Sequence, residues 1–167
     1  GGKARVQGAI DGLNQVIRDL RAYILDLKPR QMGEGGLIVG IQRLVVEFKA
    51  HTFVDVNLVH PEKGLKNLPE THSLALFHIC QETLANAAKH AKAKNVNISM
   101  WETKDRALME IRDDGIGFDM EKMRAAIGHG LANMHTRVQS VGGDVEITSH
   151  INDGTTVLAW VPRHARA

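Results

Sequence analysis

Two acids and two glycines follow a predicted strand near the middle of the chain. Residues 112–120 read R-D-D-G-I-G-F-D-M, which places Asp113 and Asp114 directly before Gly115 and Gly117. Such a stretch is compatible with a simple turn, a calcium loop or one wall of a nucleotide pocket. The calcium loop is excluded, because an EF-hand needs acids at alternate positions and a glutamate at the twelfth position of the loop. The turn and the pocket remain open.

The alternation of side chains in the preceding strand helps to decide between a turn and a pocket. With a period of two residues, Asp113 shares a face with Met109 and Ile111, so its carboxylate points toward the apolar side where the strand ends. A buried carboxylate needs a partner, because leaving it unpaired costs several kcal/mol. An amino group on a flat ring would satisfy it, and glycines would let the backbone lie close to that ring. The geometry favours a pocket for a ring that carries an amino group.

A polar stripe on a predicted helix over residues 70–93 is suited to the charged part of such a ligand. At about 100° per residue, an acid, an amide and a base lie in register opposite the apolar side, and they supply oxygen ligands and positive charge to a metal-bound phosphate chain. A solvated helix face is the simpler interpretation. His78 and Glu82 have no third ligand nearby in sequence, so a zinc site is not expected. The stripe comprises His78, Glu82, Asn86 and Lys89, with His90 at its edge.

A second glycine pair, Gly128 and Gly130 around His129, opens the next predicted helix. The free N–H groups and the dipole at a helix start form a ready site for an anion. Neither standard phosphate fingerprint is present: no G-x-x-x-x-G-K-S/T occurs, and Met120 stands where a dinucleotide fold would place its third glycine. An anion site here is therefore a hypothesis that depends on the surrounding elements.

The elements that must position these residues form an α+β pattern. Periodicity predicts helices at 37–50, 70–93 and 130–141. Strands are predicted at 53–59, 95–102, 106–112, 144–151 and 155–161, with a hairpin signal at 152–154 between the last two. This order favours a mixed, mostly antiparallel sheet with helices on one face.

The first 28 residues carry a separate, regular pattern. Apolar residues are spaced 4, 3, 4, 3, 4, 3, which is the seam of a helix that packs lengthwise against other helices. An amphipathic helix lying on its own domain is the alternative, although its apolar stripe is usually wider. A glycine-rich break at 33–36 predicts a boundary, so we expect an arm at 1–30 and a second domain at 31–167. The seam residues are Val6, Ile10, Leu13, Ile17, Leu20, Ile24 and Leu27.

Composition narrows the class of protein. The 167 residues include 21 basic and 19 acidic ones, so the net charge of +2 does not indicate nucleic acid or an anionic membrane as a partner. The single cysteine, Cys80, excludes an internal disulfide and any Cys-x-x-Cys site. The aliphatic runs are too short to span a bilayer. We expect a globular protein in a reducing, cytoplasmic setting.

Taken in order, these motifs resemble the ATP-binding domain of sensor histidine kinases, closest to the subgroup of nitrate-sensing and membrane-thermosensing kinases. That domain belongs to the wider superfamily of gyrase, Hsp90-type chaperones and mismatch-repair ATPases. The resemblance implies a two-layer sandwich of the Bergerat type, preceded by one long helix that looks like the second helix of a dimerisation and phosphoacceptor bundle. The motifs are Glu82-x-x-x-Asn86-x-x-Lys89-His90-Ala91, Asp113-Asp-Gly115-x-Gly117-Phe118-Asp119 and Gly128-His-Gly130-Leu131-x-x-Met134-x-x-Arg137, closed by Gly142-Gly143 and Gly154-Thr155.

The resemblance also implies roles for individual residues. Asp113 would accept a hydrogen bond from the adenine amino group of ATP, with Thr155 helping through water. Asn86 would bind the Mg2+ ion that bridges the phosphates, and Glu82 corresponds to the residue that positions or deprotonates water in the hydrolysing relatives. Residues 120–127 would form a short lid. The other expected nucleotide contacts are Lys89 and His90 near the phosphates, Gly115, Gly117 and Phe118 in the acid–glycine motif, and Gly128, His129, Gly130 and Leu131 at the helix start.

The sequence departs from the family pattern in two places. Asp114 stands where asparagine is often found, a change expected to be tolerated because the preceding acid carries recognition. None of the nine histidines is followed by an acid, as the subgroup's phosphoacceptor would be, so the first bundle helix is expected to be missing and the chain is not expected to phosphorylate itself. The resemblance thus implies a catalytic fragment of a two-component sensor kinase, a transferase that works as a homodimer and signals to a response regulator.

Two other functions remain open on the sequence alone. A nucleotide hydrolase or switch related to the chaperone and topoisomerase ATPases would share the fold, and its turnover would depend on Glu82. A non-enzymatic interaction module would dimerise through the seam of residues 6–27 and keep only a vestigial pocket. Steady ATP turnover would favour the first, and self-association without a nucleotide effect would favour the second.

Overall fold

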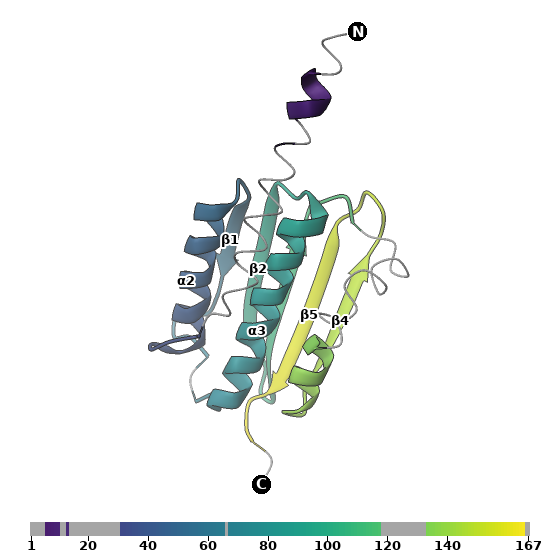
Figure 1. The fold of residues 1–167 in the computed structure, drawn as a ribbon. Coiled ribbons are helices and arrows are strands. Elements are labelled where there is room, and N and C mark those ends of the chain that lie inside the picture. Colours follow the sequence, from purple (N-terminus) through teal and green to yellow (C-terminus); the bar gives the residue numbers. More distant parts are fainter. Residues whose placement is uncertain (1–5, 11–12, 14–30, 66, 118–132, 166–167) are drawn as a thin grey trace.

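The computed structural model describes residues 6–10, 13, 31–65, 67–117 and 133–165. Within these ranges the chain forms a five-stranded sheet in the order β1-β2-β3-β5-β4, and the helices lie together on one face of it (Figure 1). The α+β architecture predicted from the sequence is confirmed. None of the described helices is both long and apolar enough to cross a bilayer. The elements are α2 (Gly36–His51), β1 (Asp55–Val59), α3 (Glu70–Asn86), η1 (Ala87–Ala91), β2 (Asn95–Glu102), β3 (Arg106–Asp113), β4 (Asp144–Ser149) and β5 (Thr155–Pro162), and residues 133–139 are also helical.

The register of the sheet aligns the ends of three neighbouring strands along one edge of the sheet, the edge at which β3 ends and β5 begins. β1 runs parallel to β2, and the other neighbouring pairs are antiparallel, as predicted for a mixed, mostly antiparallel sheet. Asp113, the last residue of β3, lies opposite Thr155, the first residue of β5. Thr155 in turn lies opposite Ser149, the last residue of β4. These three residues therefore form a row across adjacent strands.

Strand alternation sets which side chains face the helices. In β3 the side chains of Ala107, Met109 and Ile111 are buried, and Asp113 continues the same alternation. In β5 every second residue from Thr155 onward is buried. Burial of apolar surface contributes about 25 cal/mol per Å², so this face carries much of the stabilisation. The row at the sheet edge is a polar extension of the apolar core.

The longest helix differs from its predicted extent. The sequence predicts one helix over residues 70–93, whereas α3 ends at Asn86 and continues as the π-helical turn η1. The predicted end is wrong because the last turn widens and then stops at Lys92, whose positive φ of 49° turns the chain toward β2. α3 lies between α2 and the helix at 133–139 (Figure 1), so much of its surface is buried.

The remaining predicted boundaries are partly described. Gly142 has a φ of 87° and Gly143 donates its N–H to the carbonyl of Val138 at 2.8 Å, so the glycine pair ends its helix as predicted. Of the predicted arm over residues 1–30, only 6–10 and 13 are described. These residues are helical, and the seam side chains among them are exposed. The other seam residues, and with them the division at residue 30, lie outside the described residues.

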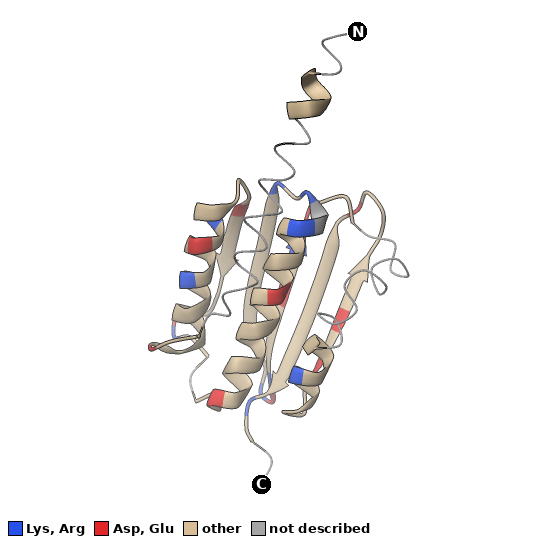
Figure 2. Cartoon of the chain, viewed as in Figure 1, with Lys and Arg blue, Asp and Glu red and all other residues tan. Residues whose placement is uncertain are grey.

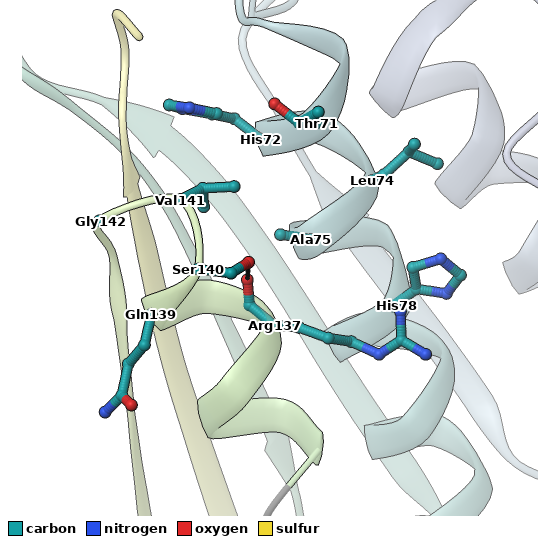
Figure 3. A pocket seen from close by; sticks show the side chains of 10 residues that line it. All are labelled: Thr71, His72, Leu74, Ala75, His78, Arg137, Gln139, Ser140, Val141 and Gly142. Carbon is teal, nitrogen blue, oxygen red and sulfur yellow. Dashed lines mark hydrogen bonds between the residues drawn. The ribbon is translucent and has the colours of Figure 1, made fainter. Parts of the chain in front are cut away.

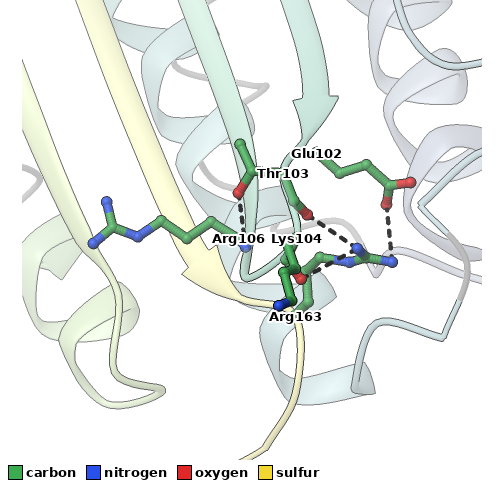
Figure 4. A network of polar contacts seen from close by, with 5 residues as sticks. All are labelled: Glu102, Thr103, Lys104, Arg106 and Arg163. Carbon is green, nitrogen blue, oxygen red and sulfur yellow. Dashed lines mark hydrogen bonds and ion pairs between the residues drawn. The ribbon is translucent and has the colours of Figure 1, made fainter.

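At the end of the sheet opposite the polar row, Arg163 contacts the turn between β2 and β3 (Figure 4). Its guanidinium donates to the carbonyls of Thr103 at 3.0 Å and Lys104 at 3.3 Å, and it lies 3.6 Å from the Glu102 carboxylate. The turn between β2 and β3 is therefore tied to the residue that follows β5. His72 makes a second tie at this edge, because its Nδ1 lies 2.7 Å from the carbonyl oxygen of Pro162.

Candidate functional site

Asp113 is half-buried where β3 ends, on the side of the sheet that faces the helices. Its Oδ1 accepts a hydrogen bond from the backbone N–H of Gly115 at 2.9 Å. Burial raises the pKa of Asp113; hydrogen bonds from the backbone of Gly115 and Thr155 oppose the rise, and the charge of Asp114 adds to it. The predicted inward direction is confirmed. A carboxylate has acceptor capacity for several donors, so Asp113 can accept a further hydrogen bond from a ligand.

Two buried hydroxyl groups lie next to the Asp113 carboxylate in the row across the strands. Thr155 is 8% exposed and Ser149 is 4% exposed. Their hydroxyl oxygens are 2.8 Å apart, and the Ser149 hydroxyl also donates to the carbonyl of Gly154 at 3.1 Å. Thr155 is a sequence-predicted site residue, and the structure brings it next to Asp113. Ser149 is not among the sequence-predicted residues.

The polar stripe of α3 is half-buried. His78, Glu82, Asn86 and Lys89 each keep only part of their surface in contact with solvent. A purely solvated helix face would be exposed, so this burial favours the functional interpretation of the stripe. The side-chain amide of Asn86 has no hydrogen-bond partner among the residues that the structure describes. It is therefore available to an external ligand.

Basic residues gather where α3 gives way to β2 (Figure 2). Lys89 lies in the π-helical turn η1, and Lys92 and Lys94 follow it directly. His90 also lies in η1, but its side chain is outside the described residues. The end of α3 thus presents positive charge at the same sheet edge as the half-buried acid Asp113, and a ligand with a negatively charged end would be attracted there.

Asp114 links this basic segment to the end of β3. Its Oδ1 accepts from the backbone N–H groups of Lys94 at 2.8 Å and Asn95 at 2.9 Å, and its Oδ2 accepts from the Asn95 side chain at 2.8 Å. The slight burial of Asp114 acts to raise its pKa, but the Asn95 side chain and the two N–H groups outweigh it, so the pKa is lowered. Asp114 therefore has a structural partner, in contrast to the ligand role expected of Asp113.

Gly117 of the acid–glycine motif lies against the turn between β4 and β5. Gly117 has a φ of +66°, and a Cβ at this position would collide with the carbonyl oxygen of His150. Gly154 has a φ of +72°, and a Cβ there would collide with the carbonyl oxygen of Asp113. The backbone N–H of Asn152 donates to the carbonyl of Ile116. The close neighbour of Gly117 is thus protein backbone, and the approach to a ring that the sequence predicts for the glycines stays a prediction.

Several sequence-predicted contacts fall outside the described residues. They are Phe118, the glycine-rich helix start Gly128, His129, Gly130 and Leu131, and the predicted lid at 120–127. The residues that the structure does bring to one edge are Asn86, Lys89, Asp113, Gly115, Gly117 and Thr155, with Glu82 one turn earlier on α3.

The donor set decides which metal the site could hold. Within the described residues, no group of three or more His, Cys, Asp and Glu side chains is placed to bind a metal ion. Mg2+ does not need such a group, because it usually keeps several waters and takes one or two protein ligands together with substrate phosphates. The unpaired amide of Asn86 fits that requirement. Cys80 is unsuited to metal or redox chemistry, because its complete burial raises the pKa of the thiol to about 12.

A cleft of about 610 Å³ lies between the first half of α3 and the helix at 133–139 (Figure 3). Arg137 and His78 line it from opposite sides, together with the apolar side chains of Leu74 and Val141. Burial lowers the pKa of His78, the charge of Arg137 lowers it further, and a hydrogen bond with Gln81 acts in the other direction. This cleft is away from the polar row, at the end of α3 where the helix begins.

Comparison with known proteins identifies the family. Residues 71–165, more than half of the chain, match the model of the family described as histidine kinase-, DNA gyrase B-, and HSP90-like ATPase. The chain is 35% identical over 146 residues to the signal transduction histidine-protein kinase/phosphatase DegS of Brevibacillus brevis, covering 87% of this chain and 37% of that protein. It is 28% identical to the oxygen sensor histidine kinase NreB of Staphylococcus carnosus, covering 95% of this chain and 44% of that protein. The chain thus spans less than half the length of these relatives.

The fold is shared with a solved structure. The histidine kinase domain from the Erythrobacter litoralis EL346 blue-light activated histidine kinase superposes with a TM-score of 0.65, covering 97% of this chain and 83% of that chain. The sequence identity is 17%. This likeness confirms the arrangement of sheet and helices on which the polar row depends.

Proposed function

This chain belongs to the family of histidine kinase-, DNA gyrase B- and HSP90-like ATPases, and we propose that it binds Mg-ATP and carries the catalytic domain of a sensor histidine kinase. The observation that carries the proposal is the half-buried carboxylate of Asp113, held on the helix side of the sheet edge with a raised pKa. Such a group is stabilised by a ligand that donates a hydrogen bond to it, and the adenine amino group is that donor.

The base end of the site is formed by strands β3 and β5. Asp113 accepts from the amino group of adenine, and Thr155, directly across the sheet from it, contacts the base through water. Gly115 is buried beside them and carries no side chain that would obstruct the ring. These contacts recognise adenine by its hydrogen-bonding groups rather than by its charge.

The phosphate end is formed by the last turn of α3 and by η1. The amide oxygen of Asn86 would hold Mg2+, and Lys89 adds positive charge in the following turn. When bound there, Mg2+ would neutralise charge on the phosphate oxygens. Phosphoryl transfer depends mostly on positioning and electrostatic stabilisation, so the contribution of this chain is to hold the γ-phosphate in place.

The acceptor of the phosphate lies outside these 167 residues. We assign it to a histidine on a separate bundle helix of the longer protein, which then passes the phosphate to a response regulator. The exposed apolar side chains of Val6, Ile10 and Leu13 are in keeping with an arm that pairs with other helices, so the longer protein is a homodimer in this proposal. Its catalytic domain faces the cytoplasm.

Nucleotide binding by the chain itself tests the proposal. Titration calorimetry with ATP and Mg2+ is expected to show binding, and Asp113→Ala is expected to weaken it at least about fivefold, since a lost buried hydrogen bond costs about 1–3 kcal/mol. Asp105→Ala, an exposed acid at the opposite edge of the sheet, is the matched control and is expected to bind normally. Equal binding by wild type and Asp113→Ala, or none by either, overturns the proposal.

The role of Glu82 separates a kinase from a hydrolase. Glu82 lies on α3 one turn before Asn86, so it can reach the phosphate end of the site. A phosphate-release assay on the isolated chain is expected to show little turnover. Steady release of phosphate that disappears in Glu82→Gln would instead favour an ATP-hydrolysing switch, with the same nucleotide site.

A further inference from the structure

The hydroxyl groups of Ser149 and Thr155 form a short buried chain that ends beside Asp113. Ser149 belongs to β4, Thr155 to β5 and Asp113 to β3, and each lies directly opposite the next across the sheet. Both hydroxyl-bearing residues are less than a tenth exposed. Water therefore does not compete freely for their hydrogen bonds, and the protein decides where each proton points.

The direction of the protons follows from what each partner can do. A serine hydroxyl has one proton to donate, whereas a carbonyl oxygen can only accept. The Ser149 hydroxyl donates to the carbonyl of Gly154 at 3.1 Å, so its proton is used there. For both contacts of Ser149 to be hydrogen bonds, Thr155 has to donate the one at 2.8 Å. The Thr155 hydroxyl consequently keeps only lone pairs for any other neighbour.

We propose that Ser149 is a positioning residue that holds the Thr155 hydroxyl as a hydrogen-bond acceptor and thereby makes the site select a base with an amino group over one with a carbonyl group at the same position. The inference rests on the proposed nucleotide site and adds a residue to it. Asp113 and Thr155 then form two adjacent acceptors. The amino group of the base then donates to Asp113, and the base or a water beside it donates to Thr155.

Replacing Ser149 changes the direction in which the Thr155 hydroxyl donates its proton, although Ser149 itself does not contact the ligand. Without the serine oxygen, the Thr155 hydroxyl can rotate and donate toward the pocket, where it would satisfy a carbonyl oxygen. The two states differ in the direction of a single proton. The effect is therefore expected in the choice between bases, and much less in overall affinity.

The test compares ATP with ITP, whose base carries a carbonyl in place of the amino group. Titration calorimetry with Mg2+ is expected to give wild type a preference for ATP of at least about tenfold, since a site built to accept a hydrogen bond rejects a ligand that cannot donate one. Ser149→Ala is expected to lower the ATP-to-ITP affinity ratio at least about fivefold, by the same reasoning. Ser149→Thr keeps the hydroxyl and is expected to restore the ratio. Ser99→Ala, on β2, is the control and is expected to leave it unchanged.

A second measurement needs no nucleotide. In proton NMR spectra, the Thr155 hydroxyl of the wild type is expected to exchange slowly with water and to show a cross-peak to Ser149, and Ser149→Ala is expected to lose the protection. Should Ser149→Ala not fold, Ser149→Cys is measured in its place, because a thiol is a poor acceptor for the Thr155 proton.

The two measurements separate the possible failures. If wild type binds ATP and the ratio is the same in Ser149→Ala, the positioning role of Ser149 is wrong and the nucleotide site stands. If the Thr155 proton is held by Ser149 but no nucleotide binds, the nucleotide site is wrong and only the hydrogen-bond direction stands. A rapidly exchanging Thr155 hydroxyl in the wild type overturns the inference directly.

Discussion

The side-chain carboxylate of Asp114 accepts two hydrogen bonds from Asn95, one from its backbone N–H at 2.9 Å and one from its side-chain amide at 2.8 Å. Lys94 adds a third from its backbone N–H. Asp114 follows Asp113 at the end of β3, whereas Lys94 and Asn95 follow the turn that ends α3. The two halves of the candidate site, one for the base and one for the phosphates, are therefore connected through this carboxylate.

Asp114→Ala is expected to lower the free energy of unfolding by about 1 kcal/mol, because three hydrogen bonds to an exposed and solvent-screened carboxylate are lost. Asp114→Asn is expected to lose less stability, because its amide oxygen can still accept from both N–H groups.

The lowered pKa of Asp114 means that the folded state favours the charged form. Its stabilisation is present at neutral pH and is lost as the pH falls through the folded-state pKa. Urea denaturation of the three proteins at pH 7 and in acid measures this, and an Asp114→Asn loss as large as that of Asp114→Ala would contradict it.

Asp113→Asn is expected to separate stability from binding. The pKa of Asp113 is raised chiefly by burial, so the charged carboxylate costs stability above its ordinary pKa, and this cost disappears as the pH falls and the group is protonated. The neutral amide is therefore expected to leave the protein at least as stable at pH 7 while binding of Mg-ATP is lost. Denaturation curves at pH 7 and in acid, with calorimetry at pH 7, test both parts. A strongly destabilised variant at pH 7 would show that the charge has a partner within the protein.

Gly117→Ala is expected to destabilise the protein by more than about 2 kcal/mol, because it combines a left-handed backbone with a collision against the carbonyl oxygen of His150. Gly36→Ala is the matched control: its φ is +84°, but a Cβ there has no neighbour within 4 Å. It is expected to lose only about 1 kcal/mol from backbone strain. Equal losses in thermal denaturation would mean that the contact with His150 is not close in solution.

Arg137→Gln is expected to raise the pKa of His78 toward its ordinary value. Burial is the main cause that lowers this pKa, and the positive charge of Arg137, which lines the same cleft as His78, lowers it further (Figure 3). A lowered histidine pKa favours the neutral ring, so wild type loses stability as the pH falls below the ordinary histidine value, and the variant should lose less. NMR titration of the His78 ring measures the shift, with Arg112→Gln on β3 as the control. No change in the His78 titration would exclude the charge of Arg137 as a cause.

Arg163→Lys is expected to destabilise the fold without affecting the nucleotide site. A lysine keeps the charge but cannot donate at once to the carbonyls of Thr103 and Lys104 and also pair with Glu102 (Figure 4). The expected loss is about 1 kcal/mol, with unchanged ATP affinity, because this network lies at the other edge of the sheet. A change in affinity would indicate that the two edges are coupled.

Strand positions were predictable to within about two residues because the alternation of apolar and polar side chains is local. The same alternation placed Asp113 on the helix side of the sheet, which the buried neighbours Met109 and Ile111 confirm. It could also have found Ser149, a polar residue on the same face of its strand as Val145, but nothing in a single strand indicates which strand becomes its neighbour. The contacts of Asp114 with residues about twenty positions away needed the sheet register in the same way.

The end of α3 shows a different limit on what can be predicted from the sequence. Residues 87–91 are mostly alanine and carry the periodicity of an ordinary helix, so the sequence predicts that the α-helix continues. The widened turn depends on how the chain must leave the helix to reach β2, which is a property of the assembled fold. Local periodicity contains no information on it.

The π-helical turn at Ala87–Ala91 also affects how relatives should be compared. Such a turn holds one more residue per circuit than an α-helix, because its hydrogen bonds span five residues instead of four. A relative that lacks the extra residue would present its basic side chains in a different direction even if every neighbouring position were the same. An alignment with such a relative would need a gap inside the helix, and the residue that corresponds to Lys89 would have to be found by its direction in space.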